Sequence, residues 1–586
     1  MTGKTSGGAA EPAAHHSGWG ALLLGLAIFG LLWILHTSYY ELYVPNGYDI
    51  PALADGLLLA PGSRWQHWFT RGYADFWNLY PEWPAYGTEF TRPAFQFVIY
   101  LAHFVMGRDW ASYQLINCFA VAGMGAVAFH IAQGVLGLRT GPSLIAAMLV
   151  VLSPPVLLTW LSGFAYAIEP LATLFVAGAF LAVVARRDLL CLAILFLALL
   201  TKENTVWAPL AAAITIMMRP KPDELLRRRA FTAAAMFLPV VMWLGLRVAF
   251  FGGIGGTYAT QGYTPLADFL KQTFDKLIHM HYLFIAHQTP PGQVRGTALL
   301  ILDRGTAVLI YTLLFLWALH ILAQTVNVLH RVNEARWPIV DAFFLVTVWA
   351  AIALVFHFAL PLSHERYATS VAVFAWPALV AEVERRRNAI VWFGLAVCCV
   401  VSLTQSSYLF VEYKSIVNSM QSDYRSMGAV LRHAPTGTRQ IYVLSATGLQ
   451  AASPEYVRLV LGVPAEIVRV AEIGWGCRKS SDLVAFDYKI VDGVVSVTVT
   501  LPDCAALYFD SNGFDGASVV NGRLYRNDTM SYELPEAHPM GERKWWLRTN
   551  FGLGRTMTVH IRPNGRARFI IQHGEGPNGI AWFDTP

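Results

Sequence analysis

The sequence is dominated by apolar runs that reach, or approach, the length of a helix crossing a lipid bilayer. Such a helix needs ~20 predominantly apolar residues, and a soluble core has no use for so many of them. The runs lie at residues 19–35, 115–136, 145–160, 171–185, 231–250, 298–321, 342–360, 371–383 and 390–409. Only 14% of the residues are charged, against roughly 25% in a soluble domain. The sequence therefore predicts a polytopic α-helical membrane protein.

Basic residues cluster in the short connections between these runs and indicate the topology. The clusters comprise Arg139, Arg186, Arg187, Arg219, Lys221, 227–229, Arg331, Arg336 and 385–387. Short cytoplasmic loops carry an excess of Lys and Arg. With a cytoplasmic N-terminus and about eleven spans, every cluster lies inside and the C-terminal segment lies outside. We expect a multi-pass protein of the bacterial inner (plasma) membrane with its C-terminal domain in the periplasm.

The segment 92–107 determines whether this topology holds. Its apolar part is about fourteen residues long, as expected of an interfacial or re-entrant helix. Counting it as a span would place the next three basic clusters outside, so we expect that it does not cross. The outer face then carries a first loop at about 38–111 and a second at about 251–297.

The composition changes near residue 412, and it predicts three parts of the chain. These are a disordered cytoplasmic tail (1–18), a transmembrane domain (19–411) and a soluble periplasmic α+β domain (412–586). In the last part we expect a helix at 422–433, a strand at 439–446 and a helix start at Ser453. Asp492-Gly493 and Asn564-Gly565 each lie between alternating apolar runs, a strong hairpin signal. We find no catalytic motif there.

Acidic residues follow the first span closely. Asp49 lies about ten residues beyond it in Asn46-Gly47-Tyr48-Asp49-Ile50, and Asp55 lies a little further along. Ionisable groups beside apolar spans are costly, and each is a functional hypothesis. The alternative is that these aspartates are solvated or cap a helix.

Lys202-Glu203-Asn204 follows an apolar run of only twelve residues, 189–200. So short a helix keeps its end at or below the outer interface. We therefore expect Lys202 and Glu203 to form a buried pair. The alternative is a snorkelling lysine beside a helix cap.

Further cations lie at the same predicted membrane level. Arg247 is close to the outer end of its span, and Arg366 belongs to the outer turn His364-Glu365-Arg366-Tyr367. Arg92, at the start of the re-entrant segment, joins them. A guanidinium in such a place needs an anion, and phosphate suits its forked donors. Together with a nearby carboxylate as general base, these cations indicate a lipid-linked phosphate or pyrophosphate substrate.

In these residues the sequence resembles the GT-C superfamily of membrane glycosyltransferases, which includes protein O-mannosyltransferases and the aminoarabinose transferases of lipid A. The resemblance covers roughly residues 19–411. It rests on Asp49, Thr91-Arg92-Pro93 before a short helix, Lys202-Glu203, the stretch 247–256 and Glu365-Arg366-Tyr367.

The resemblance implies transfer of a hexose or pentose from a polyprenyl-phosphate carrier to a glycan, lipid or protein acceptor outside the cytoplasm. By motif position Asp49 takes the acceptor's proton, Lys202, Arg247 and Arg366 bind the carrier phosphate, and Glu203 orients Lys202 or the sugar. Many relatives have two adjacent acidic residues where this chain has Asp49-Ile50. Asp55 is therefore a rival for the base.

Other functions remain as alternatives. A transporter or flippase of lipid-linked glycans is disfavoured, because we find no repeat-related halves with matching broken helices. A polysaccharide polymerase or ligase would need key arginines in a large later outer loop, and the second loop offers only Arg295. His279-Met280-His281 and His287 lack companion Cys or carboxylate residues, so we predict no metal site there. A divalent metal cofactor stays open, and we expect no nucleic-acid partner.

Overall fold

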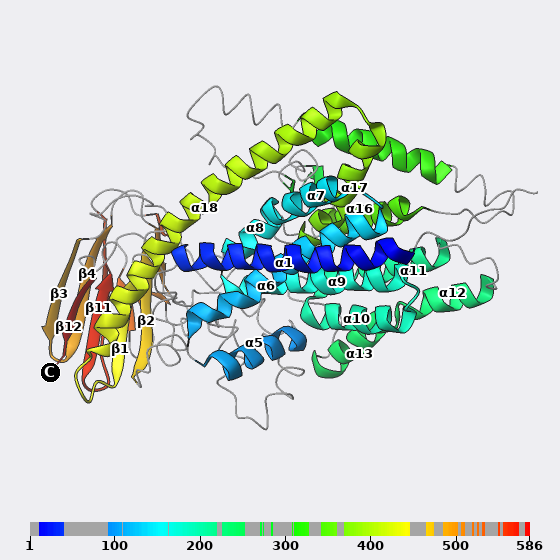
Figure 1. Ribbon diagram of the computed structural model, residues 1–586. Coiled ribbons are helices and arrows are strands. Elements are labelled where there is room, and N and C mark those ends of the chain that lie inside the picture. Colours follow the sequence, from blue (N-terminus) through cyan, green and yellow to red (C-terminus); the bar gives the residue numbers. More distant parts are fainter. Residues whose placement is uncertain are drawn as a thin grey trace, which may run out of the picture. The chain divides into compact units, whose positions relative to one another are not determined.

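A computed structural model describes the chain in segments. The described residues are 11–39, 92–107, 109–161, 163–218, 226–251, 270–271, 273–274, 283–284, 308, 310–326, 341–359, 368–445, 465–473, 485–501, 506–509, 519–520, 524–526, 530–533, 549–550, 555–572 and 580–585. They form two compact units, which divide between Tyr413 and Lys414. The first unit is helical and the second is built on β-sheets (Figure 1).

The helical unit confirms the predicted membrane-protein fold. Its described helices are α1 (Glu11–Tyr39), α5 (Pro93–Met106), α6 (Gln114–His130), α7 (Thr140–Leu152), α8 (Pro154–Leu161), α9 (Ile168–Val184), α10 (Asp188–Thr201), α11 (Ala208–Met218), α12 (Leu226–Ala235), α13 (Leu238–Phe251), Ile310–Val326, α16 (Ala342–Ala359), α17 (Thr369–Arg386) and the start of α18 (Ala389–Arg432). Short 3-10 turns and one π-turn link several of them.

Three spans in the described part of the chain are long and apolar enough to cross a membrane: Gly18–Thr37, Ala111–Val135 and Leu226–Ala249. The pair α7 and α8 qualifies as a fourth, although it bends by 52°. The bend follows from Pro154-Pro155, because neither residue can donate a helical hydrogen bond. The total of about eleven spans, and the expectation that α5 does not cross, stay predictions.

The core of the helical unit combines small residues with large aromatic ones. A Cβ on Gly125 of α6 would lie 2.6 Å from Ile28 Cδ1 of α1, so glycine there allows these helices to pack closely. Deeper inside, the Phe180 ring of α9 meets Trp349 of α16 and Phe374 of α17 edge-on, each with ring centroids 5.4 Å apart. These rings fix how α9, α16 and α17 face one another.

Helix α18 differs from the sequence prediction in one respect. The sequence predicted an apolar helix at 390–409 and a separate helix at 422–433. The structure joins both into one helix of 44 residues. No proline or glycine lies between residues 395 and 427, so the backbone has no reason to break there.

The second unit contains two six-stranded sheets. The first has the order β12-β11-β1-β2-β5-β9 and comprises β1 (Gln440–Ser445), β2 (Glu466–Ile473), β5 (Ala506–Phe509), β9 (Thr549–Asn550), β11 (Ala567–Gln572) and β12 (Ile580–Asp584). β1 lies parallel between β11 and β2. The predicted strand at 439–446 is thus confirmed as β1.

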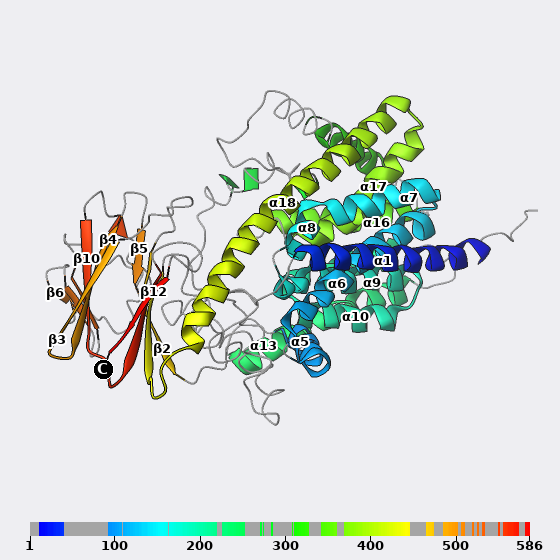
Figure 2. The ribbon, with the colours of Figure 1, turned by 60° about the vertical axis from the view of Figure 1, so that its left-hand side comes forward.

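The second sheet is antiparallel, with the order β3-β4-β10-β8-β7-β6. It comprises β3 (Ala485–Val491), β4 (Val494–Leu501), β6 (Val519–Val520), β7 (Leu524–Arg526), β8 (Met530–Glu533) and β10 (Arg555–Ile561), several of which are labelled in Figure 2. The buried Val495, Val497 and Val499 alternate along β4 with Ser496 and Thr498. Along β4, one face of the sheet is therefore apolar and the other carries hydroxyl groups.

The two hairpin predictions have different outcomes. Asp492-Gly493 connects β3 to β4 as predicted, and both residues have positive φ, 50° and 74°, as a type I′ turn requires. The prediction at Asn564-Gly565 is wrong, because β10 pairs with β4 and β8 in one sheet while β11 pairs with β1 and β12 in the other. The dipeptide turns the chain, but side-chain burial on both sheets decides the strand partners. The predicted helix start at Ser453 lies outside the described residues.

Candidate active site

The site begins where α10 ends. This helix spans 14 residues, or about 21 Å at 1.5 Å per residue, against ~30 Å for the bilayer hydrocarbon. Lys202 ends the helix with extended backbone angles, φ −154° and ψ 129°. A single turn, η4 (Glu203–Thr205), then leads towards α11. The short helix therefore places the polar tripeptide of residues 202–204 inside the helical unit.

Lys202 is buried and paired with a carboxylate that the sequence analysis did not single out. Lys202 Nζ lies 2.6 Å from Glu169 Oε1, and the two side chains are only 7% and 2% exposed. Asn204 Nδ2 donates to Glu169 Oε2 at 3.1 Å. Glu169 lies in the first turn of α9, where the helix dipole favours a negative charge. The carboxylate therefore fixes both residues 202 and 204.

Glu203 pairs with Arg92 and not with its neighbour Lys202. Arg92 Nε donates to Glu203 Oε2 at 3.1 Å, and Arg92 Nη2 donates to Oε1 at 2.7 Å. Arg92 directly precedes α5, whose first residue, Pro93, suits a helix start. The expected local pair of residues 202 and 203 is thus replaced by two ion pairs that reach other helices.

The charge of Glu203 is stabilised by its neighbours. Burial, the largest effect, raises the pKa of this carboxyl. The charges of Arg92 and Lys202, with hydrogen bonds from Arg92 and the backbone, outweigh burial together and lower the pKa to about 2. Glu203 is therefore an anion at every physiological pH, and Arg92 keeps a fixed counter-charge.

Arg247 lies on α13, which packs against the same helices. Trp243 forms a hydrophobic cluster with Leu199 and Leu200 of α10, and Ala94 of α5 packs against that cluster. Arg247 follows Trp243 by one helical turn, is 3% exposed, and has its guanidinium carbon 5.0 Å from the centroid of the Trp243 ring. The packing thus brings α13 to the helices that carry Arg92 and Lys202.

The ion pairs lie at the end of the helical unit opposite to several basic residues. Thr173 of α9 is 2.7 Å from Thr369 of α17 through their hydroxyl oxygens, and further along the rings of Phe180 and Phe374 meet. α9 and α17 therefore run in the same direction. Glu169 lies at their starting end, whereas the arginines at 186–187 and 385–387 lie at their other end.

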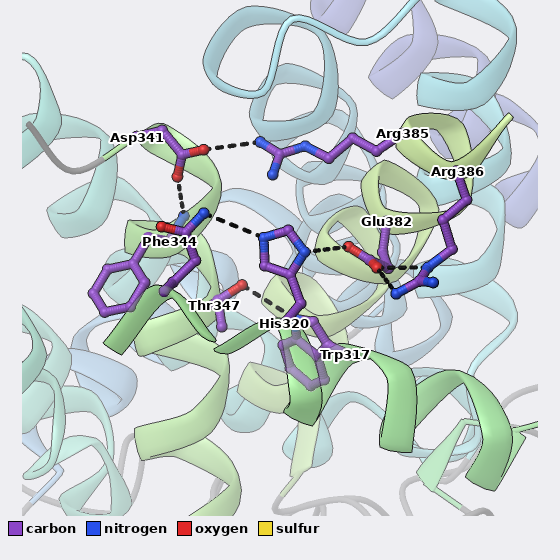
Figure 3. Close-up of polar contacts among 9 residues, drawn as sticks. Trp317, His320, Asp341, Phe344, Thr347, Glu382, Arg385 and Arg386 are labelled. Carbon is purple, nitrogen blue, oxygen red and sulfur yellow. Dashed lines mark hydrogen bonds and ion pairs between the residues drawn. The ribbon is translucent and has the colours of Figure 1, made fainter. Parts of the chain in front are cut away.

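A second polar cluster lies at this other end (Figure 3). Glu382, 2% exposed, accepts from Arg386 Nε at 2.7 Å and lies 3.2 Å from His320 Nδ1. Arg385 pairs with Asp341 at 3.1 Å, and Asp341 Oδ1 accepts from the Phe344 backbone N–H as the cap of α16. These bonds tie Ile310–Val326, α16 and α17 together, which gives the cluster a structural role.

Several predicted site residues lie outside the described residues. They are Asp49, Asp55, His364, Glu365, Arg366 and Tyr367. Their roles stay predictions, as does the reading of His279, His281 and His287. Among the residues that the structure describes, no group of three or more His, Cys, Asp or Glu side chains could hold a metal ion.

Sequence reasoning missed Glu169 and the part that Asn204 plays. The signal for Glu169 was present, because it is the only acidic residue between 140 and 187 and directly precedes Pro170 at the start of an apolar helix. A lone carboxylate in such a segment needs a cationic partner. Lys202, the only cation between 188 and 203, was the available partner.

Comparison with known proteins gives structural similarity only. No protein-family model and no curated protein matches the chain. The structure is similar to ArnT from Cupriavidus metallidurans in the apo state, with 13% identity and a TM-score of 0.43 over 78% of this chain and 86% of that one. The same protein bound to undecaprenyl phosphate gives 12% identity and a TM-score of 0.39 over 76% of this chain and 86% of that one.

A similar archaeal structure gives comparable values. The oligosaccharyltransferase AglB from Archaeoglobus fulgidus, in complex with an inhibitory peptide and a dolichol-phosphate, has 12% identity and a TM-score of 0.40 over 76% of this chain and 65% of that one. ArnT and AglB are both GT-C glycosyltransferases, the group that the sequence resembles. Similarity at this level assigns neither a residue role nor an activity to this chain.

Proposed function

We propose that the protein is a membrane glycosyltransferase that moves a sugar from a polyprenyl-phosphate carrier to an acceptor on the extracytoplasmic side. The observation that carries this proposal is the meeting of Arg92 with Glu203, and of Lys202 with Glu169, where α5, α9 and α10 come together. The forked donor of Arg92, close to the end of the short apolar helix α10, suits a phosphate attached to a membrane-embedded chain.

The chemistry needs cations at one place in particular. An oxygen or nitrogen of the acceptor attacks the anomeric carbon, the bond from that carbon to the phosphate oxygen breaks, and its electron pair leaves on the carrier phosphate. Charge therefore grows on the phosphate in the transition state, and fixed cations nearby stabilise it. We assign this task to Arg92, Arg247 and Arg366, with Lys202 held beside them by Glu169.

The acceptor's proton needs a separate base. Glu203 does not suit this task in the free protein, because its pKa is about 2 and both its oxygens accept from Arg92. Glu169 is occupied by Lys202 and Asn204. We therefore assign the base to Asp49, with Asp55 as the rival, and His364, Glu365 and Tyr367 to the binding of donor or acceptor.

The position of the basic residues supports the orientation. The described arginines at 186–187 and 385–387 lie at the opposite end of α9 and α17 from Glu169. If these arginines face the cytoplasm, as the distribution of Lys and Arg favours, the ion pairs face the periplasm of a bacterial inner membrane. We propose a cytoplasmic tail (1–18), of which residues 11–18 already belong to α1, a transmembrane domain (19–411) and a periplasmic domain (412–586), with α18 running across the last boundary.

The test measures carrier binding and sugar transfer separately. The purified full chain is titrated with a polyprenyl monophosphate and with the uncharged polyprenol, and transfer is followed with polyprenyl-phosphate sugars. We expect binding of the phosphate but not of the alcohol, loss of binding in Arg92→Gln, and loss of transfer without loss of binding in Asp49→Asn. Equal binding of phosphate and alcohol, or full transfer by Asp49→Asn together with Asp55→Asn, contradicts the proposal.

A further inference from the structure

The two ion pairs of the site differ in their access to a ligand. Lys202 and Glu169 are 7% and 2% exposed, so this is the more deeply buried of the two pairs. Arg92 and Glu203 are 11% and 25% exposed. Of these two pairs, the one between Arg92 and Glu203 is therefore the one that a ligand can reach and open.

We propose that Glu203 occupies on Arg92 the place of the carrier phosphate, and that donor binding exchanges the carboxylate for the phosphate. This inference rests on the proposed function. The exchange is the step by which the site admits its donor. Arg92 already presents Nε and Nη2 to two oxygens of one anion. A phosphate group offers two oxygens to the same fork.

The burial of Arg92 explains why a carboxylate pairs with it in the free protein. Glu203 supplies a counter-charge at 2.7 Å from Arg92 Nη2. A buried arginine is costly unless it is paired. Glu203 therefore lowers that cost until the donor arrives.

Glu203 keeps a cation beside it after the exchange. Its neighbour Lys202 also stabilises the ionised carboxylate, and Glu169 holds Lys202 in position. During transfer the electron pair of the broken carbon–oxygen bond stays on the phosphate, whose charge goes from one negative charge in the diester to two in the monoester. Arg92 then pairs with the phosphate as its charge increases, which is where a cation accelerates the reaction.

The test compares two Arg–Glu pairs of the same helical unit. Glu203→Gln removes the competing carboxylate, and we expect it to tighten binding of a polyprenyl monophosphate by about fivefold or more, without changing binding of the uncharged polyprenol. Adding Glu203→Gln to Arg92→Gln should then change nothing further. Glu382→Gln, which opens the Arg386 pair at the other end (Figure 3), should leave phosphate binding as in the wild type.

A second variant distinguishes an effect on phosphate binding from an effect on folding. Glu203→Asp keeps the charge on a shorter side chain, so we expect a smaller tightening than with Glu203→Gln. Unchanged or weaker phosphate binding in both variants, with thermal unfolding as in the wild type, overturns the exchange. That result leaves the proposed function standing if Arg92→Gln still loses binding. Failure of the wild type to prefer the monophosphate over polyprenol overturns both.

Discussion

Lys202 and Glu169 lie far apart in the sequence, yet their charged atoms approach to 2.6 Å in a place that is almost closed to solvent. Lys202 was expected to act with its neighbour Glu203. The structure instead uses consecutive residues to reach two different helices, Lys202 towards α9 and Glu203 towards α5. The tripeptide at 202–204 therefore organises the site as well as contributing charge to it.

Removing the charge of Glu169 should damage both stability and activity. Glu169→Gln removes the carboxylate that pairs with the buried Lys202, and breaking a buried pair in this way costs about 3–5 kcal/mol. We expect a lower thermal unfolding temperature in detergent and weaker sugar transfer, with partial recovery in Glu169→Asp. Glu384→Gln is the control, because its partner Arg139 is 3.9 Å away and 83% exposed. Equal effects of both variants contradict the assignment.

Replacing Arg92 by lysine should not be conservative. A lysine keeps the charge but cannot offer two donors in a planar fork. We expect the donor KM of Arg92→Lys to rise about tenfold, while the variant stays folded because Glu203 still has a cationic partner. Steady-state kinetics with varied donor concentration measure this. A donor KM equal to that of the wild type shows that the fork is not used for the donor.

The acid limb of the pH profile should not belong to Glu203. Its folded pKa is lowered to about 2, so the stabilisation from its ion pair is present above the ordinary carboxyl pKa of about 4.3 and is lost only as pH falls towards 2. Because kcat/KM reports the free enzyme, we expect its acid limb to have the same midpoint in Glu203→Gln as in the wild type. A midpoint that moves in the variant contradicts this assignment.

The sequence predicted what depends on local pattern and total charge. Apolar runs predicted the helices of the membrane unit, and the short run before Lys202 predicted that α10 would end early. The partners of Glu203 and Lys202 could not be predicted, because Arg92 is 111 positions from Glu203 and no local rule encodes that approach. The hairpin prediction at Asn564-Gly565 was wrong for the same reason, because β10 pairs with the distant strands β4 and β8.

The sheet unit gives a prediction that is independent of the site. Tyr442 is buried, its hydroxyl donates to Gln440 Oε1 at 2.9 Å, and burial together with the charge of Glu466 raises its pKa to about 12. The folded state therefore favours the neutral phenol, and this stabilisation is lost as pH rises from about 10, the ordinary value, through 12. We expect Tyr442→Phe to unfold at higher pH than the wild type and to lack one late-ionising phenol in ultraviolet titration. Identical ultraviolet titration curves of Tyr442→Phe and the wild type contradict this prediction.

The stand-in carboxylate on Arg92 has a consequence for selectivity. A small dissolved anion must displace Glu203 from bulk solution, where its concentration is low and nothing else holds it at the site. A phosphate attached to a polyprenyl chain is confined to the thin layer beside Arg92, so its effective concentration there is far higher. If Glu203 is exchanged for the carrier phosphate as proposed, the ion pair makes membrane attachment part of what the site recognises, and we expect free phosphate and sugar phosphates in the surrounding fluid not to occupy it.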